Sequence, residues 1–120
     1  MQRVVVLGAS PHSDRYSYKA IAALLSHGYD VVPVHPRGGS ILGLSVRTSL
    51  SEVPLPVDTL SLYVGGDKVA ACSDEILALK PSRVIFNPGT ENRDVQDRLG
   101  AERISVVVGC TLVMLATGQF

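Results

Sequence analysis

Five apolar runs rich in β-branched residues alternate with segments of helical periodicity along this chain of 120 residues. The runs are continuously apolar, which is typical of strands that helices cover on both faces. We predict strands at Arg3–Leu7, Tyr29–Val34, Asp58–Val64, Arg83–Phe86 and Ile104–Val108. Because strands alternate with helices in a short chain, they should form one parallel sheet with right-handed crossovers. The expected fold class is α/β, a doubly wound five-stranded sheet in a three-layer α/β/α arrangement.

The helical segments have recognisable ends. We predict helices at Ser17–His27, Lys68–Leu79, Glu91–Leu99 and Thr111–Thr117. Gly28 is well placed to stop the first helix, and Thr90 to cap the helix that begins at position 91. The segment Arg37–Leu55 is rich in glycine and shows only a short helical turn near Ser49–Val53, so we expect an irregular crossover there.

The composition limits the classes of function. Hydrophobic residues make up 46% of the chain and charged residues 18%, which is enough for one core and argues against disorder. Eleven basic and eleven acidic residues cancel, which argues against a nucleic-acid partner. We find no signal peptide, no apolar run of membrane-spanning length and too few cysteines for a disulfide framework. We therefore expect a single domain over residues 1–120, located in the cytoplasm, without a membrane partner.

Ligands of doubly wound sheets bind at the carboxyl ends of the strands, where the strand order reverses. This rule selects five loops for inspection: Gly8–Ser17, His35–Gly39, Val64–Lys68, Asn87–Asn92 and Gly109–Thr111. The first loop keeps only the first glycine of the dinucleotide fingerprint G-x-G-x-x-G and is longer than that fingerprint. The second strand ends without the carboxylate that NAD-binding proteins place on the ribose, and Arg37 follows instead. The pattern disfavours NAD and leaves NADP or coenzyme A (CoA), whose riboses carry an extra phosphate.

Hydroxyl and basic side chains accompany the glycine of the first loop. Ser10, Ser13, Arg15 and Ser17 stand at the entry to the first predicted helix. Hydroxyls and a helix N-terminus can bind a pyrophosphate, and a guanidinium adds a charge-assisted contact. Taken singly, Ser17 could be a helix cap and Arg15 a solvated charge. Their combination at the end of the first strand favours anion binding.

With these residues, the chain resembles the small, single-domain CoA-binding protein family, which is related to the N-terminal nucleotide-binding domain of succinyl-CoA synthetase α subunits. The matching stretches are GASPHSDRYSYK, GYDVVPVHPR, ILGLSVRTSLSEVPLPVD, NPGTEN and GCTLVMLATGQF. The resemblance implies a Rossmann-like fold that holds CoA, or an acyl-CoA, across the carboxyl edge of the sheet. It also implies a pyrophosphate site formed by Gly8, Ala9, Ser10, Arg15 and Ser17.

The same resemblance implies where the rest of CoA would bind. Pro36 and Arg37 would lie near the ribose 3′-phosphate, and Tyr63 and Val64 beside the adenine. The family commonly has Asn-Pro-Lys at the end of the second strand. This chain has His35 before Pro36 and Arg37, so the positive charge is kept while the Asn contact is lost or replaced.

Residues with catalytic chemistry are isolated in the sequence. Glu91 has neither a second acid nor an oriented nucleophile beside it, and we find no metal-binding or P-loop motif. His27 needs no functional role, because it lies at the C-terminal end of the first predicted helix, where it interacts favourably with the helix dipole. Cys72 lies on the apolar stripe of the helix predicted over Lys68–Leu79, so we interpret it as a core residue. Cys110 begins the last predicted helix, where it is either a small buried side chain or a thiolate able to form a mixed disulfide with CoA.

Three functions remain open. We expect non-covalent binding of CoA or an acyl-CoA for sensing, delivery or regulation, by a protein that is not an enzyme. An NADP-dependent Rossmann enzyme would need a hydride-acceptor site and a catalytic Tyr-Lys pair or His, and neither is evident. An interaction module would instead pack the apolar tail TLVMLATGQF on another subunit, which is compatible with a homo-oligomer.

Overall fold

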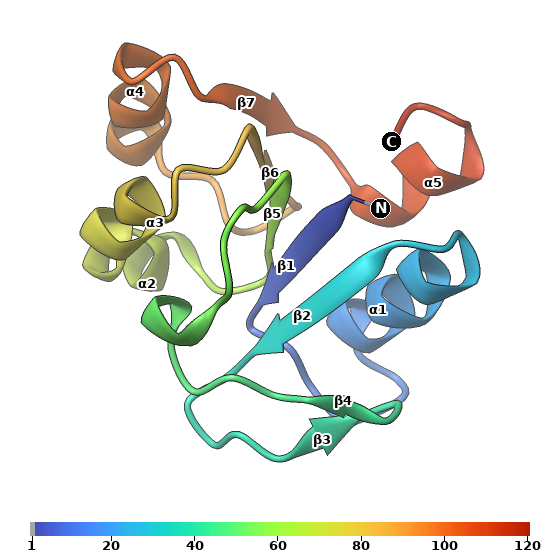
Figure 1. Cartoon of the computed structure of the whole chain (residues 1–120). Helices are drawn as coiled ribbons and strands as arrows, with labels where there is room; N and C mark the ends of the chain where they lie inside the picture. Colours follow the sequence, from blue (N-terminus) through green and yellow to red (C-terminus); the bar gives the residue numbers. More distant parts are fainter. Residues whose placement is uncertain (1) are drawn as a thin grey trace.

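A five-stranded parallel sheet with helices on both faces forms the centre of the computed structural model, which describes residues 2–120 (Figure 1). The strands are β1 (Arg3–Leu7), β2 (Asp30–Val34), β5 (Thr59–Leu62), β6 (Arg83–Phe86) and β7 (Ser105–Val108). They lie in the order β2-β1-β5-β6-β7, so the strand order reverses between β1 and β5. This arrangement confirms the predicted fold class. The largest difference is that β5 ends at Leu62, two residues before the predicted end.

The sheet separates two apolar layers. One face is covered by α1 (Tyr16–Ser26) and α5 (Thr111–Ala116), and the other by α2 (Gly66–Ala71), α3 (Ser73–Leu79) and α4 (Arg93–Ala101). In β1, Val4 and Val6 pack with the α1 and α5 side, whereas Val5 packs with the other, and all three are fully buried. Burial on both faces explains why the strand sequences are continuously apolar.

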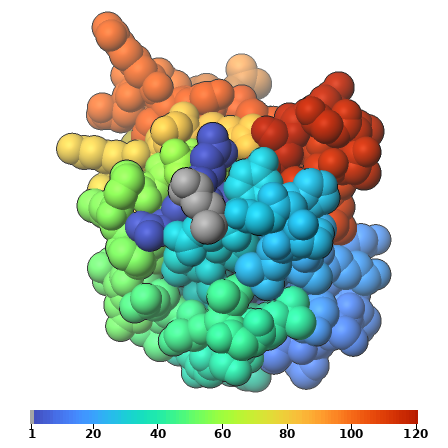
Figure 2. All heavy atoms as spheres, turned by 45° about the vertical axis from the view of Figure 1, so that its right-hand side comes forward, coloured from blue at the N-terminus to red at the C-terminus, as the bar shows by residue number. Residues whose placement is uncertain are grey.

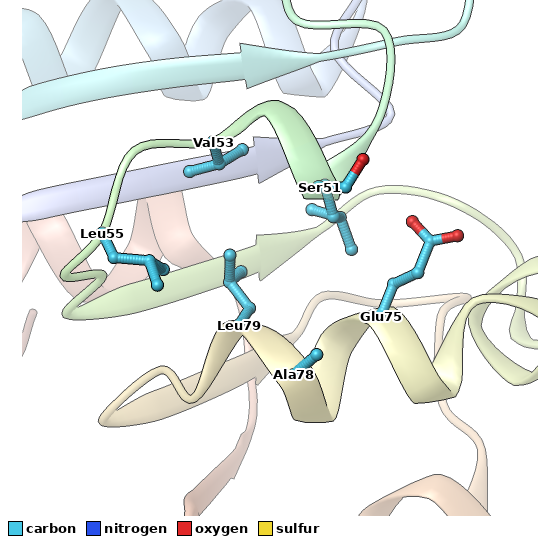
Figure 3. A pocket seen from close by; sticks show the side chains of 7 residues that line it. Ser51, Val53, Leu55, Glu75, Ala78 and Leu79 are labelled. Carbon is cyan, nitrogen blue, oxygen red and sulfur yellow. The ribbon is translucent and has the colours of Figure 1, made fainter.

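The prediction of one helix over Lys68–Leu79 is wrong, because the chain breaks at Cys72 into α2 and α3. After the break, α3 packs against the 3₁₀ turn η1 (Leu50–Glu52). A groove of about 150 Å³ lies between them, and Figure 3 shows the side chains of Val53, Leu55 and Leu79 around it. Cys72 is half-buried against this core, and burial raises the pKa of its thiol.

The segment Arg37–Leu55 is more regular than predicted. It contains an antiparallel hairpin of β3 (Ser40–Ile41) and β4 (Leu44–Ser45), whose connecting residues both have positive φ. The chain then runs beside β2, where the Arg47 N–H donates to the Pro33 carbonyl at 2.9 Å. The turn predicted near Ser49–Val53 is present as η1. Two-residue strands are too short for periodicity to reveal them.

Helix α4 begins later than predicted, at Arg93, and Thr90 is not its cap. The Asn92 side chain accepts a hydrogen bond from the Val95 N–H at 3.1 Å and is the N-cap. The Thr90 hydroxyl instead donates to the Asn87 carbonyl at 2.7 Å. Thr90 therefore closes the preceding turn rather than the helix. Within residues 2–120, no helix has the length and apolar character needed to cross a membrane.

Candidate functional site

A cleft of about 560 Å³ opens at the carboxyl ends of β1, β5 and β6, where the strand order reverses. Its walls come from the loops after these three strands, from His35 after β2, and from the first turns of α1 and α2. The lining residues are Gly8, Ala9, Ser10, His12, Arg15, Tyr16, Ser17, His35, Tyr63, Val64, Gly65, Lys68, Pro88, Gly89 and Thr90. Ligands of doubly wound sheets bind at this position.

The base of the cleft depends on a close approach between the ends of β1 and β5. Gly8 has φ +89°, and its N–H donates to the Val34 carbonyl at 3.0 Å. A Cβ atom on Gly8 would lie 2.8 Å from Val64 Cγ1 and 2.9 Å from the carbonyl carbon of Tyr63. Only glycine satisfies both the backbone conformation and the spacing.

The N-terminus of α1 opens into the cleft. The helix begins at Tyr16 after Arg15, which makes no side-chain cap, and its first turn contains no acidic residue. The first amides of a helix have no intrahelical acceptor, so they attract an anion together with the helix dipole. Ser17 is 4% exposed, lines the cleft and is not a cap, so the cap interpretation is wrong. Within the described residues, its hydroxyl makes no hydrogen bond.

Among residues 2–120, two cationic side chains line the cleft and no acidic side chain does. Arg15 comes from the first loop and Lys68 from α2. Both are exposed, and neither forms an ion pair with any residue in the range 2–120. Sequence reasoning selected the loop that ends at Lys68 but did not assign this lysine to the site. The cleft therefore combines a helix N-terminus with two uncompensated positive charges.

A second cleft of about 210 Å³ adjoins the first and shares Ala9, Ser10, His12 and His35 with it. Its outer wall is formed by Arg37 and the start of the β3–β4 hairpin. The Arg37 N–H donates to His35 Nδ1 at 3.1 Å. His35 thereby holds the turn that presents Arg37.

The structure brings nine of the ten predicted site residues to these two clefts. Arg37 lines the second cleft, and Pro36 lines neither, because it lies at the exposed turn. The other eight line the first: Gly8, Ala9, Ser10, Arg15, Ser17, His35, Tyr63 and Val64. Sequence reasoning missed His12 and Lys68, although both lie in loops selected by the strand-end rule.

Tyr63 forms part of the cleft wall while its hydroxyl is buried. The ring packs with the core on the α1 and α5 side. Within residues 2–120 the hydroxyl has no hydrogen-bond partner. Burial raises the pKa of Tyr63, while the nearby hydroxyls of Thr111 and Ser61 act in the opposite direction. The ring is therefore the part of Tyr63 that a ligand in the cleft would meet.

Behind the cleft, Asn87 joins three elements through a buried network. Asn87 is 3% exposed, and its Nδ2 donates to Ser61 Oγ at 2.9 Å and to the Leu62 carbonyl at 2.8 Å. Its Oδ1 accepts from the Thr111 N–H at 2.8 Å. The network fixes α5 and positions the turn over Pro88–Thr90 that lines the cleft. Sequence reasoning selected the loop that begins at Asn87 but assigned Asn87 no role.

The remaining candidates lie outside the clefts or have local roles. Cys110 is half-buried at the start of α5 and lines neither cleft. The Glu91 carboxylate accepts from the Gly89 N–H at 2.8 Å, and His27 Nδ1 donates to the Ala23 carbonyl at 2.8 Å. Among residues 2–120, no group of three or more histidine, cysteine, aspartate or glutamate side chains could bind a metal ion.

The strand order and the cationic cleft at its reversal define a doubly wound α/β domain of the Rossmann-like type. The chain belongs to the CoA binding domain family, whose model matches residues 2–116. This match confirms the resemblance predicted from the sequence.

The chain is also similar to individual proteins and solved structures. The uncharacterized protein YneT of Bacillus subtilis strain 168 is 29% identical over 107 residues, which cover 89% of this chain and 79% of YneT. The crystal structure of an uncharacterized protein is 42% identical, with a TM-score of 0.92 over 100% of this chain and 98% of that one. An acetyl-coenzyme A synthetase of Ca. Korarchaeum cryptofilum is similar over 90% of this chain and 25% of its own, with a TM-score of 0.76. At 23% identity, the last similarity shows the fold alone.

Proposed function

We propose that this protein binds CoA or an acyl-CoA non-covalently in the two adjoining clefts, for sensing, delivery or regulation. The observation that carries the proposal is the first cleft, which is lined by the N-terminus of α1, by Ser17 and by two cations that form no ion pair within residues 2–120. An anion with several phosphate oxygens matches this set of donors. Membership of the CoA binding domain family supports CoA as that anion.

In this proposal, each part of CoA has its own place. The pyrophosphate binds at Gly8–Ser10 and the start of α1, with Arg15 and Ser17. The adenine lies beside Tyr63 and Val64. The 3′-phosphate points through the shared wall at His35 toward Arg37, which lines the second cleft.

Replacing Arg37 by alanine is expected to weaken CoA binding by about 1.5–3 kcal/mol, roughly a tenfold to 150-fold loss, because a charge-assisted hydrogen bond is removed. Dephospho-CoA should bind both proteins equally, since it lacks the 3′-phosphate. Calorimetric titration measures both ligands. Arg93→Ala is the matched control, because Arg93 is exposed on α4 and lines neither cleft. Equal losses for CoA and dephospho-CoA would contradict the place given to Arg37.

Replacing Ser17 by alanine tests the pyrophosphate site. We expect CoA and dephospho-CoA to lose affinity equally, by about 1 kcal/mol, because both contain the pyrophosphate that the hydroxyl would contact. The free energy of unfolding should change little, because the hydroxyl has no partner among residues 2–120 to lose. Ser13→Ala is the control, since Ser13 lies in the same loop but lines neither cleft. Unchanged affinity in Ser17→Ala would remove Ser17 from the site.

The alternative of an NADP-dependent enzyme gives a different result in the same titration. Binding of CoA in preference to NADP supports the proposal, and tighter binding of NADP overturns it. We further propose binding rather than catalysis, because His35 and Glu91 hold turns while Arg15, Lys68 and Arg37 offer positive charge. Incubation with acetyl-CoA should therefore leave the thioester intact. Release of free thiol above the rate without protein would contradict this part.

A further inference from the structure

The three histidines of the chain differ in what their imidazole rings contact. His27 lies at the end of α1, where its Nδ1 is 2.8 Å from the Ala23 carbonyl oxygen, and it lines neither cleft. His35 lines both clefts, and its Nδ1 accepts from the Arg37 N–H at 3.1 Å. His12 also lines both clefts, but within the described residues its imidazole forms no hydrogen bond and no ion pair. Of the three rings, that of His12 therefore has both nitrogens available to a ligand in the clefts.

The backbone holds His12 in the turn between β1 and α1. Its N–H donates to Ser10 Oγ at 3.2 Å, and its carbonyl accepts from the Arg15 N–H at 3.1 Å. The second cleft lies where this turn meets the β3–β4 hairpin. Figure 2 shows the hairpin, in green, beside the segment that contains α1, in blue, at the molecular surface. His12 thus lies at the wall that the two clefts share, next to the place proposed for the pyrophosphate.

A positive charge on His12 would find no oppositely charged partner in the empty clefts. The other charged or titratable residues that line them are Arg15, Tyr16, His35, Arg37, Tyr63 and Lys68. Between pH 6 and pH 8, arginine and lysine side chains are cations and tyrosine side chains are neutral. Burial raises the pKa of Tyr63, which keeps it neutral in this range. The acidic residues nearest to these in the sequence, Asp14, Asp67 and Glu91, line neither cleft.

We propose that His12 binds the pyrophosphate of the ligand as an imidazolium, so that binding takes up a proton and strengthens as the pH falls. Histidine is the side chain that ordinarily changes charge between pH 5 and pH 8, and a phosphate group beside it favours the charged form. The charged ring donates a charge-assisted hydrogen bond to a phosphate oxygen. His35 is less suited to this role, because a proton on its Nδ1 would break the bond from the Arg37 N–H. The inference rests on the proposed function, since the phosphates belong to the bound CoA.

Calorimetric titration with dephospho-CoA measures the proton uptake. This ligand keeps the pyrophosphate but lacks the 3′-phosphate, whose own titration near pH 6 would overlap with that of the protein. Titrations at pH 7 in two buffers of different ionisation enthalpy, neither of them phosphate, should show uptake of about half a proton per ligand bound. Between pH 8 and pH 6, the Kd should fall by a factor of about three to ten.

Substitutions separate the three histidines. His12→Gln removes the charge but keeps a polar side chain, so proton uptake should disappear and the loss of affinity relative to wild type should be largest at pH 6. His12→Lys is a cation throughout this range, so it should bind without proton uptake and with a Kd nearly independent of pH. His35→Gln should retain the proton uptake. His27→Gln is the matched control, because it makes the same substitution outside both clefts, and it should titrate like wild type.

Binding of dephospho-CoA by wild-type protein without proton uptake would overturn the inference and leave the proposed function standing. Uptake that persists in His12→Gln, or that either His27→Gln or His35→Gln abolishes, would also overturn it. If neither CoA nor dephospho-CoA bound at any pH, the proposed function would fail and the inference with it. Far-ultraviolet circular dichroism confirms that each variant is folded.

Discussion

Alanine at position 8 is expected to lower the free energy of unfolding by about 2–6 kcal/mol. Two costs add in this variant. The φ of +89° is strained for any residue with a Cβ, at about 1–3 kcal/mol, and forcing an extra carbon into packed surroundings costs another 1–3 kcal/mol or so. The new Cβ would meet the Tyr63 backbone at 2.9 Å, and backbone yields less easily than a flexible side chain.

Urea unfolding of Gly8→Ala and Gly28→Ala separates the two costs. Gly28 also has a positive φ, of +84°, but no neighbouring atom lies within 4 Å of the position of its Cβ. Gly28→Ala should therefore lose only about 1–2 kcal/mol, from backbone strain. If the free energy of unfolding fell equally in both variants, the close approach of β1 and β5 would not contribute to the cost of Gly8→Ala. The folded fraction of Gly8→Ala should also bind CoA more weakly, because the base of the cleft must open.

The second large effect is expected at Asn87. Asn87→Ala removes a side chain that makes three buried hydrogen bonds and leaves the Thr111 N–H and the Leu62 carbonyl without their partner. An unsatisfied buried polar group costs about 1–3 kcal/mol, so we expect a total loss near 3 kcal/mol in the free energy of unfolding. Chemical denaturation measures this loss.

Asn92→Ala provides the comparison for Asn87. Asn92 is half-buried, caps α4 by accepting from the Val95 N–H and donates from Nδ2 to the Gly66 carbonyl at 3.1 Å, so its loss should cost about 1–2 kcal/mol. A cost at Asn87 no greater than at Asn92 would show that solvent or rearrangement replaces the buried network. Because the network also fixes the turn over Pro88–Thr90, Asn87→Ala should weaken CoA binding as well.

Local sequence signals located the loops that line the two clefts where one residue defines a local structure. Gly8 follows an apolar run and precedes a helix, and this pattern alone located the loop at which the cleft opens. Arg37 was found because it follows the second strand, where the architecture places a ligand. Thr90 was misread as a cap, and a cap was also one open interpretation of Ser17, because a hydroxyl near a helix start is compatible with several partners and only the fold selects among them.

Contacts between distant segments were not predictable. Lys68 and Arg15 are 53 positions apart, and they line one cleft only because β5 returns beside β1. Phe120 illustrates the same limit in the core. Its ring lies 5.0 Å from that of Tyr29, measured between ring centroids, and the Arg83 guanidinium lies 4.3 Å above it. Nothing local in the sequence around Phe120 indicates these partners.

The sequence by itself determined the fold class, the strands of the five-stranded sheet and the loops that line the two clefts, because apolar periodicity and glycine conformation act over a few neighbouring residues. The tertiary structure alone decided the network around Asn87 and the pairing of Arg47 beside β2. These features depend on which strand lies next to which. That strand order is set by burial of the whole core, so it cannot be predicted from a short segment of the sequence.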